Sequence, residues 1–218
     1  MIIFKEIERI AQERAGGAAA LKKRLAVPKS AKALRAVADD RYLSLMSLRV
    51  FRAGLKHSLV DAKWPAFEER FFGFDPHRVR AMSDEALEAL MSDKALIRHW
   101  PKIKSVRANA AAMVALDGCG AYLADWPGDD VVGLWDDIAK RFSQMGGNSG
   151  PMFLRMAGKD SFILTPDVER ALGRFRDLEG PFKSKRARRA AQDAFNHWAI
   201  ESGRPLCQIS QILALAAS

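Results

Sequence analysis

A glycine-rich turn between two helical segments is the feature that most limits how this chain can fold. Residues 138–145 carry apolar side chains at near-helical spacing, and the run 146–150, GGNSG, follows directly. Glycine supplies the positive φ values that end a helix, and Pro151 suits the first turn of the next helix, with Asn148 or Ser149 as its cap. Backbone N–H groups in such a turn point in one direction and can bind phosphate. An ordinary loop between two helices is the alternative.

Apolar side chains recur at helical spacing along most of the chain. Leu45, Leu48 and Phe51, for example, form one stripe within residues 42–55. Pro65 is well placed to begin a new helix, and Thr165 is a good N-cap for a helix that starts at Pro166. No alternating pattern is long enough to predict a strand, and there is no internal repeat or low-complexity tract. We therefore expect an all-α fold.

Composition limits the class of protein and its compartment. With 218 residues and 49% hydrophobic content, the chain can bury a full core, as one large or two small lobes. A formal charge of +9 favours a polyanionic partner, nucleic acid or anionic lipid, over a merely basic soluble protein. Cys119 and Cys207 are too few for a disulfide framework, a four-cysteine zinc site or a cysteine-ligated cluster. We expect reduced thiols and a cytoplasmic protein without a signal peptide or membrane span.

The middle of the chain carries a series of short motifs in fixed order. They are Phe74-Asp75-Pro76, Leu96-Ile97-Arg98-His99, Lys102-Ile103 and Asn109-Ala110, with Ala53-Gly54-Leu55 upstream. This series resembles the 3-methyladenine DNA glycosylase I family, and residues 142–168 are similar to the hairpin of the wider helix-hairpin-helix glycosylase superfamily. The resemblance covers roughly residues 40–170.

The resemblance implies a fold and an activity. It implies two helical lobes with a cleft between them, with residues 1–38 as a helical extension and residues 39–218 as the glycosylase-like domain. Within that domain we expect the hairpin near 138–158 and basic helices over 181–218. The implied activity is monofunctional excision of a damaged, alkylated base from double-stranded DNA, by a monomer at the nucleoid. Such an enzyme flips the nucleotide out, which requires a basic face and a pocket.

Three residues fall at or near the base pocket that the resemblance implies. Arg49 stands where the family has its base-recognising glutamate, which reverses the charge that a cationic base would meet. His57 stands at a pocket tryptophan, and it either stacks on the base or packs within the protein. Tyr42 is the third pocket candidate. The family's zinc-binding cysteines and histidines have no convincing counterparts, so we expect no metal and no other cofactor.

Asp167 is the candidate catalytic carboxylate. The superfamily carries an aspartate in a VDTHV-like segment, which residues 164–168, LTPDV, match with the acid two places late. A carboxylate beside the sugar would stabilise the positive charge of the transition state. Alternatively, Asp167 only stabilises the first turn of its helix. Bifunctional members have a lysine nucleophile where this chain has Ser149, so we expect no lyase activity.

Several positions are candidates for contact with DNA phosphate. Lys102 and Lys104 lie near a helix start, although an exposed basic face is the alternative. The densest positive cluster contains Lys183, Lys185 and Arg186, and cations are disfavoured at a helix N-terminus, which favours phosphate binding over a solvated face. The remaining candidates lie in the turn: Gly146, Gly147, Asn148 and Ser149. If Arg49 and the displaced Asp167 abolish catalysis, a non-catalytic DNA-binding or lesion-recognition protein on the same scaffold is the alternative function.

Overall fold

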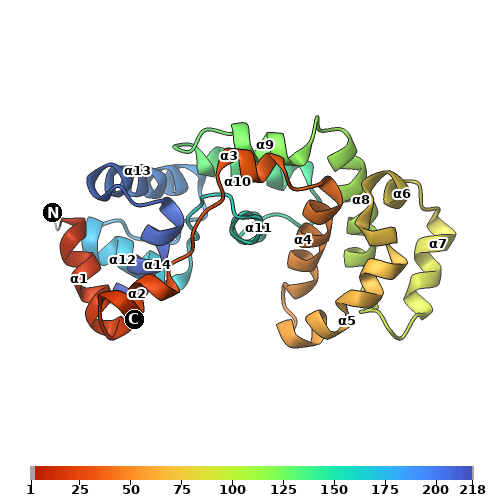
Figure 1. Cartoon of the computed structure of the whole chain (residues 1–218), viewed down its shortest axis with the longest axis horizontal. Helices are drawn as coiled ribbons and strands as arrows, with labels where there is room; N and C mark the ends of the chain where they lie inside the picture. Colours follow the sequence, from red (N-terminus) through yellow and green to blue (C-terminus); the bar gives the residue numbers. More distant parts are fainter. Residues whose placement is uncertain (1–2, 218) are drawn as a thin grey trace. The chain divides into compact units, whose positions relative to one another are not determined.

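A computed structural model describes residues 3–217, and each regular element in that range is a helix (Figure 1). The α-helices are α1 Phe4–Ala15, α2 Ala18–Arg24, α3 Ala31–Arg35, α4 Asp39–Arg52, α5 His57–Arg70, α6 Pro76–Arg80, α7 Asp84–Ala89, α8 Trp100–Val114, α9 Cys119–Asp125, α10 Val131–Arg141, α11 Ser149–Ala157, α12 Pro166–Arg176, α13 Lys185–Ser202 and α14 Leu206–Ala217. Short 3-10 helices, η1 Phe72–Phe74 and η2 Leu90–Ser92, follow α5 and α7. The all-α prediction is confirmed for this range.

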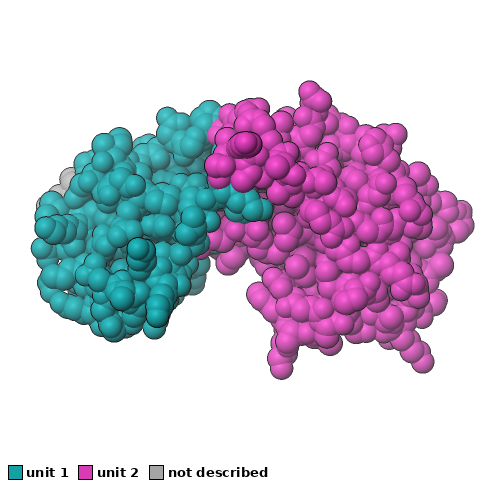
Figure 2. Space-filling view, viewed as in Figure 1, with its two compact units in different colours: residues 1–29, 127–134, 158–218 teal, residues 30–126, 135–157 magenta. Residues whose placement is uncertain are grey.

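The chain forms two compact units, coloured separately in Figure 2. Unit 1 contains residues 1–29, 127–134 and 158–218, and unit 2 contains residues 30–126 and 135–157. We expect a boundary after residue 38 from the sequence, whereas in the structure α1 and α2 belong to the same compact unit as the C-terminal helices. How these units correspond to functional domains stays a prediction.

Unit 1 is held together by packing between its first and last helices. α14 packs against both α1 and α12 (Figure 1). Phe4 of α1 lies against Trp198 of α13, and the ring of Phe162 stacks on Phe195 with centroids 4.1 Å apart. The carboxylate of Asp160 accepts hydrogen bonds from the first two N–H groups of α14, at 2.9 and 2.8 Å. Because the first N–H groups of a helix have no partner within it, this contact fixes where α14 begins.

Unit 2 contains a run of packed aromatic rings. The Trp64 ring stacks on Phe67 and on Phe74, with centroids 5.1 and 5.3 Å apart. Trp64 and Phe67 lie on α5, which runs from His57 to Arg70 with Pro65 inside it. The predicted helix start at Pro65 is therefore wrong. Proline has no N–H for the helical ladder, but aromatic packing on both sides of residue 65 keeps the segment in one helix.

Close helix packing in unit 2 depends on one glycine. At Gly120 of α9, a β-carbon would lie 2.6 Å from the carbonyl oxygen of Leu34 in α3. Carbon and oxygen atoms do not approach so closely without a bond, so only glycine lets α9 pack against α3 in this way. Across the described chain, no helix combines the length and apolar character that a bilayer span needs.

Candidate functional site

The glycine-rich turn lies between two helices, α10 and α11, and belongs to unit 2. α10 ends at Arg141, a turn follows, and α11 begins at Ser149. Gly147 has a φ of +58°, and the N–H of Met152 donates to the carbonyl of Asn148, which places Asn148 at the N-cap position. Gly146 and Gly147 are exposed, and their N–H groups donate to no acceptor in the described part of the chain. Two exposed, unpaired N–H groups are a suitable donor set for an anion.

The three predicted pocket residues lie in different environments. Tyr42 of α4 is fully buried, and its hydroxyl donates to the carbonyl of Leu34 at 2.7 Å. This hydrogen bond satisfies the hydroxyl inside the core, so Tyr42 as found does not line an open pocket. His57 is exposed at the first position of α5. Arg49 is partly buried near the end of α4, and its Nε has no hydrogen-bond partner in the described structure.

The predicted phosphate contact of Lys102 is wrong for the structure as found, because such a contact requires an exposed side chain. The residue is buried, and its Nζ donates to the carbonyls of Ala53 and Phe51, at 2.6 and 3.2 Å. These carbonyls belong to the last turn and C-cap of α4, where carbonyl groups lack helical partners. Burial lowers the pKa of the Lys102 ammonium, and the nearby Arg49 guanidinium lowers it further. Lys102 therefore fastens α8 to α4 and brings a second cation close to Arg49.

Lys104, by contrast, is exposed as predicted. Its Nζ lies 5.2 Å from the centre of the Trp100 ring, within the range of a cation–π interaction. The side chain forms no ion pair with a carboxylate in residues 3–217.

Asp167 has the local geometry that the sequence predicts. The hydroxyl of Thr165 accepts a hydrogen bond from the N–H of Val168, and Pro166 begins α12. Asp167 lies in the first turn with 44% of its side chain exposed, and its carboxylate pairs with Arg170. This arrangement stabilises the helix start. Asp167 belongs to unit 1 and Arg49 to unit 2, and the catalytic role of Asp167 stays a prediction.

The basic cluster of residues 183–186 lies at the start of α13. Ser184 is the N-cap, and its hydroxyl accepts a hydrogen bond from the N–H of Ala187 at 3.1 Å. Lys183, Lys185 and Arg186 are exposed and form no ion pair within the described chain, whereas Arg189 on the next turn pairs with Asp130. The three exposed cations are thus available to a polyanion.

Metal-binding side chains do not gather within residues 3–217, where no three of the histidine, cysteine, aspartate and glutamate residues lie together as a ligand set. Cys119 is buried, and burial raises the pKa of its thiol. A thiol that stays protonated is a poor metal ligand and a poor nucleophile.

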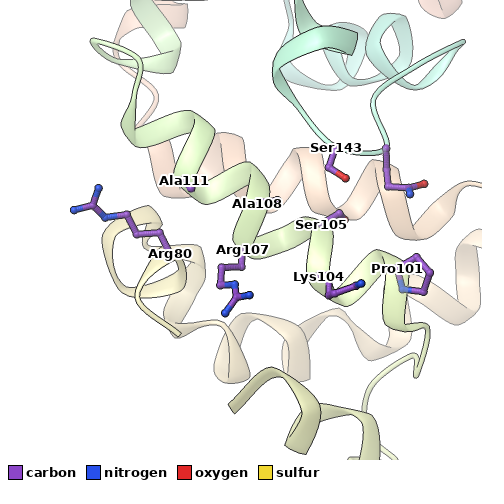
Figure 3. Close-up of a pocket in the computed structure, with 9 residues that line it drawn as sticks. Arg80, Pro101, Lys104, Ser105, Arg107, Ala108, Ala111 and Ser143 are labelled. Carbon is purple, nitrogen blue, oxygen red and sulfur yellow. The ribbon is translucent and has the colours of Figure 1, made fainter. Parts of the chain in front are cut away.

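One surface feature of unit 2 is missing from the sequence predictions. It is an open groove of about 620 Å³ between the exposed face of α8 and the turn before α11, shown in Figure 3. Lys104, Arg107, Ala108 and Ala111 line it from α8, and Arg80 lines it from α6. The spacing of the α8 residues, three or four apart, signals one helix face. Arg80 is distant in sequence, and no pattern connects it to that face.

Part of this chain is similar to proteins of known family. Residues 33–131 match the family model described as methyladenine glycosylase. The predicted family resemblance is confirmed. The DNA-3-methyladenine glycosylase of Haemophilus influenzae is 33% identical over 75 residues, which are 34% of this chain and 40% of that protein. The DNA-3-methyladenine glycosylase 1 of Escherichia coli is 31% identical over 88 residues, 40% of this chain and 47% of the relative.

The similarity to methyladenine glycosylases extends to the fold. A crystal structure of 3-methyladenine DNA glycosylase I superposes with a TM-score of 0.50 and 22% identity, covering 64% of this chain and 86% of that one. The chain spans less than half the length of the curated relatives it matches. The methyladenine glycosylase match includes Arg49, His57 and Lys104, whereas Asp167 and the cluster at 183–186 lie beyond it.

Proposed function

We propose that this protein is a monofunctional DNA glycosylase that excises an alkylated base from double-stranded DNA. The observation that carries the proposal is the match of residues 33–131 to the methyladenine glycosylase family. Two relatives named DNA-3-methyladenine glycosylase, each more than 30% identical over the aligned segment, support the substrate class.

The proposed reaction breaks the bond between the base and its deoxyribose. Positive charge develops on the sugar as this bond lengthens, and a carboxylate beside the sugar lowers the barrier before water adds. Asp167 is our candidate for that carboxylate. An alkylated purine already carries positive charge and leaves readily, so strong acid catalysis is not required. Ser149 stands where a lyase needs a lysine, which supports hydrolysis without strand cleavage.

The proposed DNA contacts come from unpaired donors and cations on both units. In unit 2 they are the Gly146 and Gly147 N–H groups and Lys104; in unit 1 they are Lys183, Lys185 and Arg186. Contacts of this kind neutralise phosphates without reading the sequence. The proposed substrate implies a nucleoid-associated protein in the cytoplasm.

Incubation with defined duplexes tests the proposal. Each duplex carries one alkylated, deaminated or oxidised base, and the products are analysed with and without alkaline treatment. We expect free base from an alkylated duplex and strand breaks only after alkali, because an abasic site survives until alkali cleaves it. Strand breaks without alkali would contradict monofunctional action. Release of no base from any duplex would contradict the glycosylase assignment.

A non-catalytic DNA-binding protein on the same scaffold is the second candidate, and Arg49 is the observation that favours it. The Arg49 guanidinium and the nearby Lys102 ammonium would repel a cationic base. This candidate requires duplex binding without base release. It also predicts that Arg49→Glu, which restores the family's carboxylate, gains excision of alkylated purines, whereas Arg52→Glu on the same helix does not.

A further inference from the structure

The groove of unit 2 carries positive charge that does not stabilise α8, the helix that forms one wall of it. Lys104 lies just beyond the first turn of α8, where the helix dipole gives no stabilisation to a cation. Arg80 and Lys104 are both exposed, and neither pairs with a carboxylate in the described residues. Arg107 differs, since its guanidinium donates to the carbonyl of Met82 at 2.8 Å and to Asp84. Within the described residues, two cations without a carboxylate partner therefore lie in the same groove as Arg107, which has one.

The cations of the groove are spread along its surface, as binding of a row of negative charges requires. In Figure 3 the charged ends of Arg80, Lys104 and Arg107 point in different directions and meet at no common point. A small anion needs donors that converge on it, whereas a row of phosphates is matched by cations spread along a surface. Ala108 and Ala111 line the α8 wall with small side chains, and exposed Ser143 and Gln144 add polar groups opposite.

We propose that this groove binds the phosphate backbone of DNA, as a contact surface separate from the turn at 146–149. The proposal rests on the proposed function only in taking DNA as the polyanion. Phosphates would contact Arg80 and Lys104 directly. Ser143 and Gln144, which line the groove and precede residues 146–149, would donate to the same strand, because serine and glutamine commonly bind phosphate oxygens.

Binding to an undamaged duplex at increasing salt concentrations tests the groove. The full-length protein is compared with the double variant Arg80→Gln, Lys104→Gln. Because each phosphate contact contributes about one unit to the slope of log K against log salt, we expect the slope to fall by about two. The matched control is Lys32→Gln, Lys94→Gln, which removes two exposed charges of unit 2 outside the groove. We expect the control to keep the wild-type slope.

The outcomes separate the groove from the proposed function. If both double variants change the slope equally, the groove cations contribute no more to binding than other surface cations. This result would overturn the proposal, even if the wild type excises bases. If only the groove variant changes the slope while no duplex loses a base, the groove stands and the glycosylase assignment fails. A wild-type slope in the groove variant, with intact helical circular dichroism, would also overturn the proposal.

Discussion

Asn109 and Ser143 are joined by two hydrogen bonds. The Asn109 side-chain amide donates to the carbonyl of Ser143 at 3.1 Å, and the N–H of Ser143 donates to Asn109 Oδ1 at 2.7 Å. Asn109 is fully buried in α8, and Ser143 begins the turn before α11. One side chain thus satisfies both backbone polar groups of a turn residue and ties the hairpin to α8.

Asn109→Ala should lower the free energy of unfolding by about 1–3 kcal/mol, since it leaves backbone polar groups without their partners. Urea denaturation monitored by circular dichroism measures this change. Ser143→Ala is the matched control: only the backbone of Ser143 takes part, so its effect should stay within about 0.5 kcal/mol. Equal effects of the two substitutions would mean that the pair does not hold the hairpin.

Asp167→Asn should slow base excision by about 100-fold or more, the scale of a lost electrostatic contact to the transition state, while leaving the protein folded. Single-turnover rates on an alkylated duplex measure the loss. Glu169→Gln, in the same first turn of α12, removes a similar charge near the helix start and should leave the excision rate unchanged. A rate that is normal in both variants would assign Asp167 to helix stabilisation alone.

Arg49→Met should raise the free energy of unfolding by about 1 kcal/mol, because the buried Nε has lost its water without gaining a partner. Arg52, on the next helical turn, is the comparison, since it pairs with Asp61 at 2.7 Å. Arg52→Met should lower stability by up to about 1 kcal/mol, the usual value of a surface ion pair. Thermal or urea unfolding measures both stability changes. A lower stability of Arg49→Met would show that the Arg49 guanidinium has a stabilising partner in the folded protein.

Tyr42→Phe should change how stability depends on alkaline pH. Burial first, then the nearby Cys119 and Asp39, raises the pKa of Tyr42 from 10.0 to about 12. Between these values the unfolded chain releases a proton that the folded chain keeps, so stability is full below pH 10 and is lost as pH rises through 12. Phenylalanine has no ionisable hydroxyl, so the substitution removes this pH-dependent contribution to stability. In urea unfolding at several pH values, the free energy of unfolding of wild type relative to Tyr42→Phe should decrease above pH 10. A difference that does not change with pH would contradict the raised pKa of Tyr42.

Local sequence patterns predicted the helices and the hairpin well. Thr165 and Pro166 begin α12 as expected, because an N-cap acts on N–H groups two or three residues away. Gly147 has the expected positive φ for the same reason, since this conformation needs no distant contact, but the other positive φ of the turn is at Gln144 and not at Gly146.

Burial of particular side chains could not be predicted in the same way. Lys102 and Lys104 are two residues apart, yet one binds the carbonyls at the end of α4 and the other faces solvent. Only the packing of α8 against α4 separates them. The burial of Tyr42 likewise involves a neighbouring helix, α3, whose Leu34 carbonyl accepts a hydrogen bond from the Tyr42 hydroxyl. Arg80 cannot be predicted as a groove residue for the same reason, since α6 packs against α8 only in the folded chain.

The discontinuous make-up of unit 1 affects the order in which the chain can fold during synthesis. α1 leaves the ribosome well before α14, the helix against which it packs. The apolar side chains of Phe4, Ile7 and Ala11 therefore lack the cover of α14 until that helix has been made, and exposed apolar surface of this kind promotes aggregation. Unit 2, whose last residue is 157, can form before α14 is made, and α1 and α14 of unit 1 pack together only afterwards.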